Sequence, residues 1–452
     1  MTQRDQGLPY QPTAEAATLP AETSKNMLIT RPSKVRWRLL LCLFALSAVT
    51  YLDRVNISIS GRRIAGEFHF NDVQLGWIFS AFVVGYAIFQ VPGGWLADRF
   101  GARRVLTSGA LWWAVFTAAT AAIYAKTTNA LGIFLAVRFM LGAGEAVVYP
   151  SSNRFVANWI PSGERGIANG VIFAGVGAGA GVTPLLITAI MMRFGWRMSF
   201  WLCAVLGAVA GLVWLLLARD HPEEHVGVNQ AEMEVIRSGL VIPPRGRSSV
   251  PWATVFASRD VMASSFSYFC YGYAAYIFFS WFFIYLNEVR GVNLRVSAFY
   301  TMLPFIGMVA GSPLGGLLGD AVTRRWGKRL GRCGIAAVGM GLGAVFIALG
   351  ADVKRTGLST VVLTVGVFAL FLAQSSFWAL TADIAGPSAG AVSGLMNLCC
   401  QVGGAVTASL TPVIAIHFGW TASFLTAAGL CALGAAAWLF VDPNRVLPCR
   451  TG

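Results

Sequence analysis

Twelve long apolar stretches run through this chain of 452 residues, and they constrain its fold more than any other feature. A helix rises 1.5 Å per residue, so about 20 residues are needed to cross a bilayer core of about 30 Å. Backbone polar groups in lipid must be satisfied within the segment, so these stretches predict transmembrane helices. The predicted spans are 37–60, 74–97, 105–126, 129–151, 166–191, 197–218, 262–287, 296–319, 332–351, 357–382, 389–415 and 420–441.

The composition excludes a water-soluble protein. Asp, Glu, Lys and Arg make up 12% of the chain and hydrophobic residues 56%, whereas an average soluble domain has roughly 25% charged residues. The formal net charge of +14 comes from arginines in short loops between apolar stretches, where they orient helices in a bilayer. We therefore expect an all-α integral membrane protein of 12 transmembrane helices that contacts lipid and binds no nucleic acid.

A polar stretch after the sixth span divides the chain into two halves. Residues 219–261 hold Pro243-Pro244 and most of the acidic loop residues, which is typical of a linker. Residues 1–36 have no apolar core, which predicts a disordered cytoplasmic leader and no signal peptide. The expected organisation is leader 1–36, six-helix bundle 37–218, cytoplasmic linker 219–261, six-helix bundle 262–441 and cytoplasmic tail 442–452.

The distribution of basic residues predicts the orientation. With the N-terminus inside the cell, the inner side carries 23 Lys and Arg residues and the outer loops carry nine. Cytoplasmic loops carry the excess of Lys and Arg, so both termini are expected in the cytoplasm, and we expect a bacterial inner membrane.

The two halves repeat each other at a nearly constant offset. Gly94-x-x-x-Asp98 follows the second span and Gly316-x-x-x-Asp320 follows the eighth, so the two aspartates are 222 residues apart. Phe194-Gly195-Trp196 returns as Phe418-Gly419-Trp420, 224 residues later. Matching landmarks in two halves indicate a duplicated transporter with pseudo-two-fold symmetry.

The loop after the second span reads Gly-x-x-x-Asp-Arg-x-Gly-x-Arg-Arg and resembles the signature loop of the major facilitator superfamily. A glycine here allows close approach to a neighbouring helix. Asp98 is able to accept hydrogen bonds from a helix N-terminus and from arginines, which predicts a cytoplasmic latch that breaks when the inner gate opens. The residues assigned to gating are Gly94, Asp98, Arg99, Arg103, Arg104 and Asp320.

Four charged residues fall well inside predicted spans, away from their ends: Asp53 and Arg54 in the first, Arg138 and Glu145 in the fourth. Each costs about 2.5 to 3.5 kcal/mol to insert, so each needs a partner or a function. Arg138 and Glu145 are almost two turns apart and share one helix face, at about 10 Å. The four form either a neutral cluster that fixes helix packing or a site that exchanges a proton for an anion; we favour the second interpretation.

Several segments together resemble the anion:cation symporter branch of that superfamily. They are Tyr51-x-Asp53-Arg54-x-Asn56, Gln90-x-Pro92-Gly93-Gly94, the Arg138/Glu145 pair, Phe269-Cys270-Tyr271-Gly272-Tyr273 and Trp281-x-x-x-Tyr285-Leu286. The resemblance implies that Asp53 and Glu145 carry the coupling proton. It also implies that Arg54 binds a substrate carboxylate and that Arg138 links substrate to proton. Tyr86 matches a substrate-facing tyrosine.

In the second half the resemblance implies substrate contacts by Ser375, Trp378, Asn397 and Gln401, with Tyr273 and Tyr276 ranked lower. Ser375 and Gln401 are equally explained by hydrogen bonding between helices, and the two tyrosines by packing.

Two segments depart from the family pattern. Residues 281–285 have no proline, so a proline kink in the seventh span is not supported. The fifth span has glycine at 175, 177, 179 and 181, where sugar-acid carriers offer an amide to substrate hydroxyls. Close helix packing explains these glycines, and a less hydroxylated or bulkier anion would suit such a wall.

The function expected from the sequence is a proton-coupled importer of a small organic anion, such as a hexonate, hexarate or hexuronate, and we expect it to be a monomer. The proton is the coupling ion. The eight cysteines and four histidines form no metal-binding or disulfide pattern, so no metal, other cofactor or enzymatic activity is expected. The alternatives are an exporter or facilitator on the same fold and a membrane sensor that moves no ligand.

Overall fold

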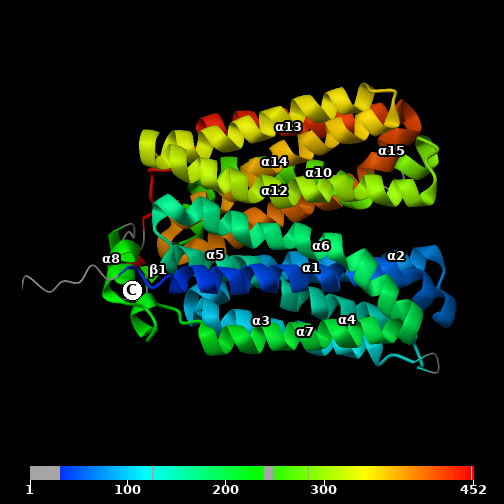
Figure 1. Cartoon of the computed structure of the whole chain (residues 1–452), viewed down its shortest axis with the longest axis horizontal. Coiled ribbons are helices and arrows are strands. Elements are labelled where there is room, and N and C mark those ends of the chain that lie inside the picture. The colour runs from blue at the N-terminus through cyan, green and yellow to red at the C-terminus, as the bar shows by residue number, and fades with distance from the viewer. Residues whose placement is uncertain are drawn as a thin grey trace, which may run out of the picture.

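The computed structural model describes residues 31–124, 127–238, 248–249, 251–282, 285–448 and 450–451. Most of the predicted leader lies outside these residues. The described part of the chain is almost entirely helical, and its long helices lie roughly parallel in two side-by-side groups (Figure 1). This confirms the predicted all-α fold with two six-helix bundles.

The first bundle contains α1 (Val35–Phe68), α2 (Asp72–Phe100), α3 (Ala102–Ala121), α4 (Ala130–Glu145), α5 (Val148–Trp159), α6 (Arg165–Phe194) and α7 (Trp196–Leu217). The second contains α10 (Arg259–Ser280), α12 (Leu294–Trp326), α13 (Ile335–Asp352), α14 (Thr356–Ala385) and α15 (Ala389–Ala437). Because α5 continues α4 and α15 consists of two helices, the twelve predicted spans all have a helical counterpart. Among the residues that the structure describes, eight stretches are long and apolar enough to cross a membrane, and one of these, Thr356–Phe440, contains three helices.

Shorter elements connect the long ones. They are α8 (Gln230–Ser238), α9 (Trp252–Ala257), the 3-10 turns Ser162–Glu164, Pro222–Glu224, Gly386–Ser388 and Trp438–Phe440, the π turns Tyr285–Val289 and Arg329–Gly334, and the antiparallel pair β1 (Ser248–Ser249) and β2 (Arg450–Thr451). Helix α8 and β1 lie at one end of the molecule (Figure 1), here called the linker end.

Two glycine corners confirm the internal repeat in three dimensions. Gly195 separates α6 from α7, and Gly419 interrupts α15, with φ of 82° and 83°. With ψ near 165°, this backbone conformation is essentially restricted to glycine. Each corner is followed by a tryptophan that begins the next helix, as the repeated Phe-Gly-Trp motif predicts.

The seventh span differs from its prediction as one helix over 262–287. Helix α10 ends at Ser280, Trp281 leaves helical geometry at φ −120°, and a π turn follows at Tyr285–Val289. The side chain of Arg290 secures this turn through the Tyr285 hydroxyl at 2.6 Å and the carbonyl of Val353 at 2.8 Å. The helix therefore breaks here without a proline.

Within the predicted linker, α8 binds the start of α1. The Glu232 carboxylate is buried and accepts hydrogen bonds from the backbone N–H groups of Val35 and Arg36, at 2.9 and 3.2 Å. It also pairs with the Arg36 guanidinium at 3.3 Å and accepts from the Ser33 hydroxyl. These bonds satisfy N–H groups that the first turn of a helix leaves free, so α8 acts as an external cap for α1.

The fifth-span glycines lie in helix α6 and bring it close to its neighbours. A Cβ on Gly175 or Gly179 would lie 2.4 or 2.3 Å from carbonyl oxygens of α1, and one on Gly177 would lie 2.6 Å from Val309 of α12. Close packing of α6 against both bundles thus explains three of the glycines noted in the sequence.

Candidate functional site

The four intramembrane charges lie together inside the first bundle. The Arg54 guanidinium of α1 pairs with the Glu145 carboxylate of α4 at 3.2 Å, and the Glu145 side chain is fully buried. Asp53 is also fully buried and accepts a hydrogen bond of 2.5 Å from the Thr117 hydroxyl of α3. The ion pair formed by Glu145 is thus with Arg54, a partner that seven-residue spacing on one helix does not reveal.

Arg138 is the least satisfied of the four. Its side chain is buried, and its Nε and Nη1 atoms have no hydrogen-bond partner among the residues that the structure describes. Its guanidinium lies 4.9 Å from the centroid of the Phe82 ring. A buried guanidinium with free donors is suited to receive an anion or a carboxylate that changes its position.

Aromatic rings surround the Arg54 guanidinium. Its central carbon lies 4.3 Å from the ring centroid of Tyr86, 4.9 Å from that of Tyr51 and 5.1 Å from that of Phe82. Aromatic faces attract a cation and hold it in place without neutralising its charge. These rings hold the Arg54 guanidinium in place, and Glu145 is the carboxylate that pairs with it.

A cavity of about 50 Å³ lies between the two bundles, next to this cluster. Tyr51 and Tyr86, which flank Arg54, form part of its wall, and six of its lining residues are tyrosines. Aromatic walls with a few amide groups are typical of sites for small ligands. The lining residues are Tyr51, Tyr86, Tyr149, Phe173, Val176, Tyr268, Tyr271, Ala275, Tyr276, Phe279, Phe371, Gln374, Asn397, Cys400 and Gln401.

Four of the predicted substrate residues line this cavity: Tyr86, Tyr276, Asn397 and Gln401. The Tyr276 hydroxyl donates to the Gln401 side-chain oxygen at 2.5 Å. The Asn397 amide donates to the Gln90 side-chain oxygen of α2 at 2.9 Å. Asn397 thus connects the cavity to the opposite bundle.

Ser375, Trp378 and Tyr273 are not among the lining residues. The Ser375 hydroxyl donates to the carbonyl of Ser312 at 2.7 Å, so it bonds two helices together. Tyr273 is buried, with no hydrogen-bond partner for its hydroxyl within the described residues.

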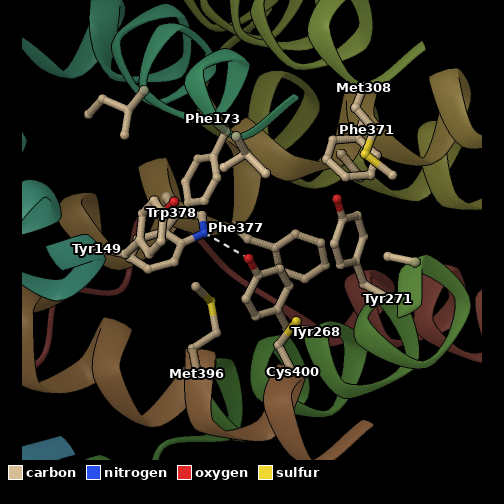
Figure 2. Close-up of a cluster of buried hydrophobic side chains, with 14 of the residues drawn as sticks. Tyr149, Phe173, Tyr268, Tyr271, Met308, Phe371, Phe377, Trp378, Met396 and Cys400 are labelled. Atoms are coloured by element: carbon tan, nitrogen blue, oxygen red, sulfur yellow. Dashed lines mark hydrogen bonds between the residues drawn. The ribbon is translucent and has the colours of Figure 1, made fainter. Parts of the chain in front are cut away.

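Trp378 lies one layer behind the cavity wall. Its indole N–H donates to the Tyr268 hydroxyl at 2.9 Å, and its ring packs against Phe173 at 5.0 Å between centroids (Figure 2). The Gln374 amide donates to the same hydroxyl at 2.9 Å. Trp378 and Gln374 therefore fix the orientation of Tyr268, a lining residue that the sequence analysis did not single out.

Several further lining residues were missed at the sequence level. Tyr149 stacks on Phe173 with ring centroids 5.0 Å apart, and Tyr271 presents a buried hydroxyl without a described partner. Tyr51 and Tyr271 belong to the quoted family segments, but no role was given to either. In a chain with 11 Tyr and 30 Phe residues, aromatic character alone does not separate a cavity wall from a lipid-facing surface.

The two gating aspartates make equivalent contacts at the linker end. Asp98 of α2 accepts from the backbone N–H groups of Gly390 and Ala391, at 2.9 and 2.7 Å. Asp320 of α12 accepts from those of Gly166 and Ile167, also at 2.9 and 2.7 Å. Each aspartate thus caps the first turn of a helix in the opposite bundle.

Glycine permits both of these approaches. A Cβ on Gly94 would lie 2.1 Å from the carbonyl oxygen of Gly390, and one on Gly316 would lie 2.3 Å from that of Gly166. A side chain at either position would separate the bundles, which supports the gating assignment of Gly94.

The arginines of the signature loop lie elsewhere than expected. Arg103 donates to the carbonyl of Leu215 at 2.9 and 2.7 Å, inside its own bundle. Arg99 packs over the ring of Trp95, and Arg104 is exposed. The arginine nearest to the Asp98 carboxylate is Arg154, at 3.7 Å, so it takes the place that the sequence analysis gave to the loop arginines.

A buried ion network reinforces the Asp320 contact. Arg332 is fully buried and pairs with Asp320 at 2.6 Å and with Asp383 at 3.2 Å. Arg165 of the first bundle pairs with Asp383 at 2.6 Å. The second bundle is therefore tied to the first by charge as well as by helix capping.

Within the described residues, hydrogen bonds between the two bundles gather at the linker end. They include Asn153 with Thr381 and Arg154 with the Gly386 carbonyl, both at 2.8 Å, and the one nearest the cavity joins Asn397 to Gln90. The structure is therefore closed on the linker side of the cavity.

Comparisons with known proteins agree with this geometry. The sequence model described as Major Facilitator Superfamily matches residues 39–408. The probable sulfoacetate transporter of Cupriavidus necator is 34% identical over 87% of this chain and 91% of its own length. The hexuronate transporter of Bacillus subtilis is 28% identical over 93% of this chain and 98% of its own length.

Two solved structures share the fold. The proton:xylose symporter XylE, bound to a bromodeoxyglucose, aligns with a TM-score of 0.70 and 15% identity, covering 92% of this chain and 98% of its own. The fucose:proton symporter FucP of E. coli aligns with a TM-score of 0.68 and 16% identity, covering 91% and 99%.

Proposed function

Because the chain belongs to the Major Facilitator Superfamily and is a multi-pass membrane transporter, not an enzyme, we propose that it is a symporter that imports a small organic anion together with protons. Import proceeds by alternating access, in which the two six-helix bundles rock about the central cavity. We propose bundle boundaries at 37–218 and 262–441, with a cytoplasmic linker between them.

The ion pair between Arg54 and Glu145 carries this proposal. A carboxylate that neutralises Arg54 competes with an incoming anion for the same guanidinium. Protonation of Glu145 removes that competition and leaves Arg54 free to bind a substrate carboxylate. Asp53 and Arg138 complete a set of two acids and two bases, whose charges cancel when all four are ionised. Each proton that binds to one of the acids raises the net charge of the site by one unit.

The named relatives and the cavity support the proposed substrate class. Relatives carry the names hexuronate and galactarate/D-glucarate transporter, which supports a sugar acid. A second candidate is a compact carboxylate with a further anionic group, since a relative is named as a probable sulfoacetate transporter. The cavity favours this candidate because its walls are mostly aromatic and α6 contributes Phe173 and Val176, but no amide, to the lining.

The direction of transport rests on the orientation. The linker side carries 23 Lys and Arg residues and the opposite loops carry nine. This excess supports an orientation in which the linker end lies on the cytoplasmic side of a bacterial inner membrane and both termini are in the cytoplasm. The structure then corresponds to a state closed toward the cytoplasm. We further propose that the protein works as a monomer and binds no nucleic acid.

The test is uptake into liposomes by the purified full chain. A pH gradient, acidic outside, should drive accumulation of labelled glucarate or sulfoacetate by the wild-type protein. Glu145→Gln should abolish accumulation but retain exchange of labelled for unlabelled substrate. Glu223→Gln, at an exposed carboxylate of the linker, is the matched control and should behave as wild type.

Four outcomes would contradict the proposal. Accumulation by Glu145→Gln at the wild-type rate would remove the coupling assignment. Uptake that is independent of the pH gradient would favour a facilitator. Extrusion driven by the pH gradient would favour an exporter. Binding without any turnover of either anion would favour a membrane sensor.

A further inference from the structure

A second, larger cavity lies on the outside of the first bundle, away from the central site. Its walls are α2 from Phe89 to Phe100, α3 from Arg104 to Trp112 and α4 from Met140 onward to Val147, and its volume is about 650 Å³. We call it the α2–α3–α4 groove. Its walls are almost entirely apolar, and Phe100 and Trp112 are about half exposed, so the groove opens outward, toward lipid.

The length of the groove matches one leaflet of a bilayer. At 1.5 Å per residue, α3 descends about 12 Å from Arg104 to Trp112, and α2 about 16 Å from Phe100 to Phe89. Half of a hydrocarbon core of about 30 Å is about 15 Å. A chain that enters at the linker end and follows the groove therefore reaches about the middle of the membrane.

The mouth of the groove is positively charged. Arg104 lies in the first turn of α3, is exposed, and makes no hydrogen bond or ion pair within the described part of the chain. Arg99 lies beside it, with its guanidinium 5.4 Å from the centroid of the Phe100 ring. The Asp220 carboxylate, which accepts the backbone N–H of Arg103, is outnumbered by the arginine side chains of the signature loop.

From these observations we propose that the α2–α3–α4 groove binds one anionic phospholipid. Its phosphate pairs with Arg104 at the membrane surface, and one acyl chain lies along the apolar walls. Arginine near the headgroup level attracts anionic lipids, and an apolar slot of this volume is within the range of ligand sites.

The bound chain would contact the joint between α4 and α5. Gly144 and Val147 form part of the groove wall, and Glu145 lies between them, facing the interior of the bundle. A Cβ on Gly144 would lie 2.3 Å from the Trp112 ring, so α3 and α4 are in close contact at this wall. A bound acyl chain would therefore contact the segment that positions Glu145. Lipid binding itself does not depend on the function proposed above.

The test measures lipid binding to the purified full chain by native mass spectrometry during titration with dioleoyl phosphatidylglycerol or dioleoyl phosphatidylcholine. Wild-type protein should bind phosphatidylglycerol about five-fold more tightly, the effect of one arginine near the headgroup. Arg104→Ala should remove this preference. Ser108→Phe and the milder Ser108→Leu, which fill the groove, should weaken binding of both lipids.

The matched control is Arg325→Ala, because Arg325 lies at the same end in the second bundle, over the ring of Trp326. It should keep the wild-type preference. An equal loss in Arg325→Ala and Arg104→Ala would show general attraction of lipid to a basic surface and overturn the proposal. The proposal would also be overturned if the two Ser108 variants bound both lipids as tightly as the wild type while having the melting temperature of the wild type.

Discussion

The two bundles share one fold but keep their buried charges at different depths. In the first, Asp53 and Arg54 lie midway along α1 and Arg54 pairs with Glu145, next to tyrosines that line the central cavity. In the second, Arg332 and Asp383 lie at the linker end, where the bundles touch. The part of the cavity wall that the second bundle contributes is formed by tyrosine rings and side-chain amides.

This difference assigns separate tasks to two copies of one repeat. Charge in the middle of the first bundle is suited to bind an anion and to exchange a proton. Charge at the end of the second stabilises the closed state. The same contrast appears between the two latches, because Asp320 has the buried Arg332 as a partner at 2.6 Å while Asp98 has Arg154 at 3.7 Å.

The largest expected effect is at the stronger latch. Asp320→Asn leaves Arg332 buried with one carboxylate fewer, and breaking a buried ion pair costs about 3 to 5 kcal/mol. We expect a clear fall in melting temperature and faster labelling of cysteines placed on the linker side of the cavity. Asp98→Asn is the comparison and should show both changes more weakly. Equal losses in the two variants would mean that the latches are equivalent.

The next effect concerns the charges of the first bundle. Arg54→Lys keeps the charge but loses the planar fork that matches two carboxylate oxygens. Loss of such a contact in a desolvated site costs about 2 to 5 kcal/mol, or roughly 30-fold to several-thousand-fold in affinity. Calorimetric titration of the transported anion measures this. Arg63→Lys, further along α1, is the control.

Binding by Arg54→Lys within threefold of the wild type would show that Arg54 is a structural partner of Glu145. The substrate carboxylate would then be held elsewhere, and Arg138, with its free donors, is the next candidate.

The smallest effect is expected in the cavity wall of the second bundle. Tyr276→Phe removes the hydrogen bond to Gln401, and a neutral bond of this kind contributes about 0.5 to 1.5 kcal/mol. Substrate affinity should therefore fall by about two- to tenfold, with the proton dependence of uptake unchanged. A shift in that dependence, measured against external pH, would place Tyr276 in the coupling machinery and weaken the division of tasks.

The sequence was sufficient to predict the spans and the equivalence of the two aspartates, because both depend on local patterns. Apolar length determines which segments cross a membrane, and the equal contacts of Asp98 and Asp320 follow from a repeat offset of 222 residues. The four charges inside the spans could also be identified from the sequence, because a charged residue stands out in an apolar stretch.

The pairing of the buried charges and the identity of the cavity-lining residues could not be predicted from the sequence. Whether Glu145 meets Arg138 or Arg54 depends on how α1 and α4 are rotated against each other, which a single-helix spacing does not contain. Tyr149 and Tyr268 line the cavity because of tertiary packing, while similar aromatic residues on other faces meet lipid. Arg332 was counted as a cytoplasmic loop charge, although it is fully buried between two aspartates.

The cap that α8 places on α1 has a consequence for dividing the protein into two chains. Glu232 supplies hydrogen bonds that the first turn of α1 cannot supply itself, so the start of the linker belongs physically to the first bundle. A break introduced after Ser238 leaves that carboxylate with its partners, whereas a break before Gln230 leaves the first fragment with an uncapped helix. Co-expressed fragments should therefore reassemble into a working transporter from the first kind of break far more readily than from the second.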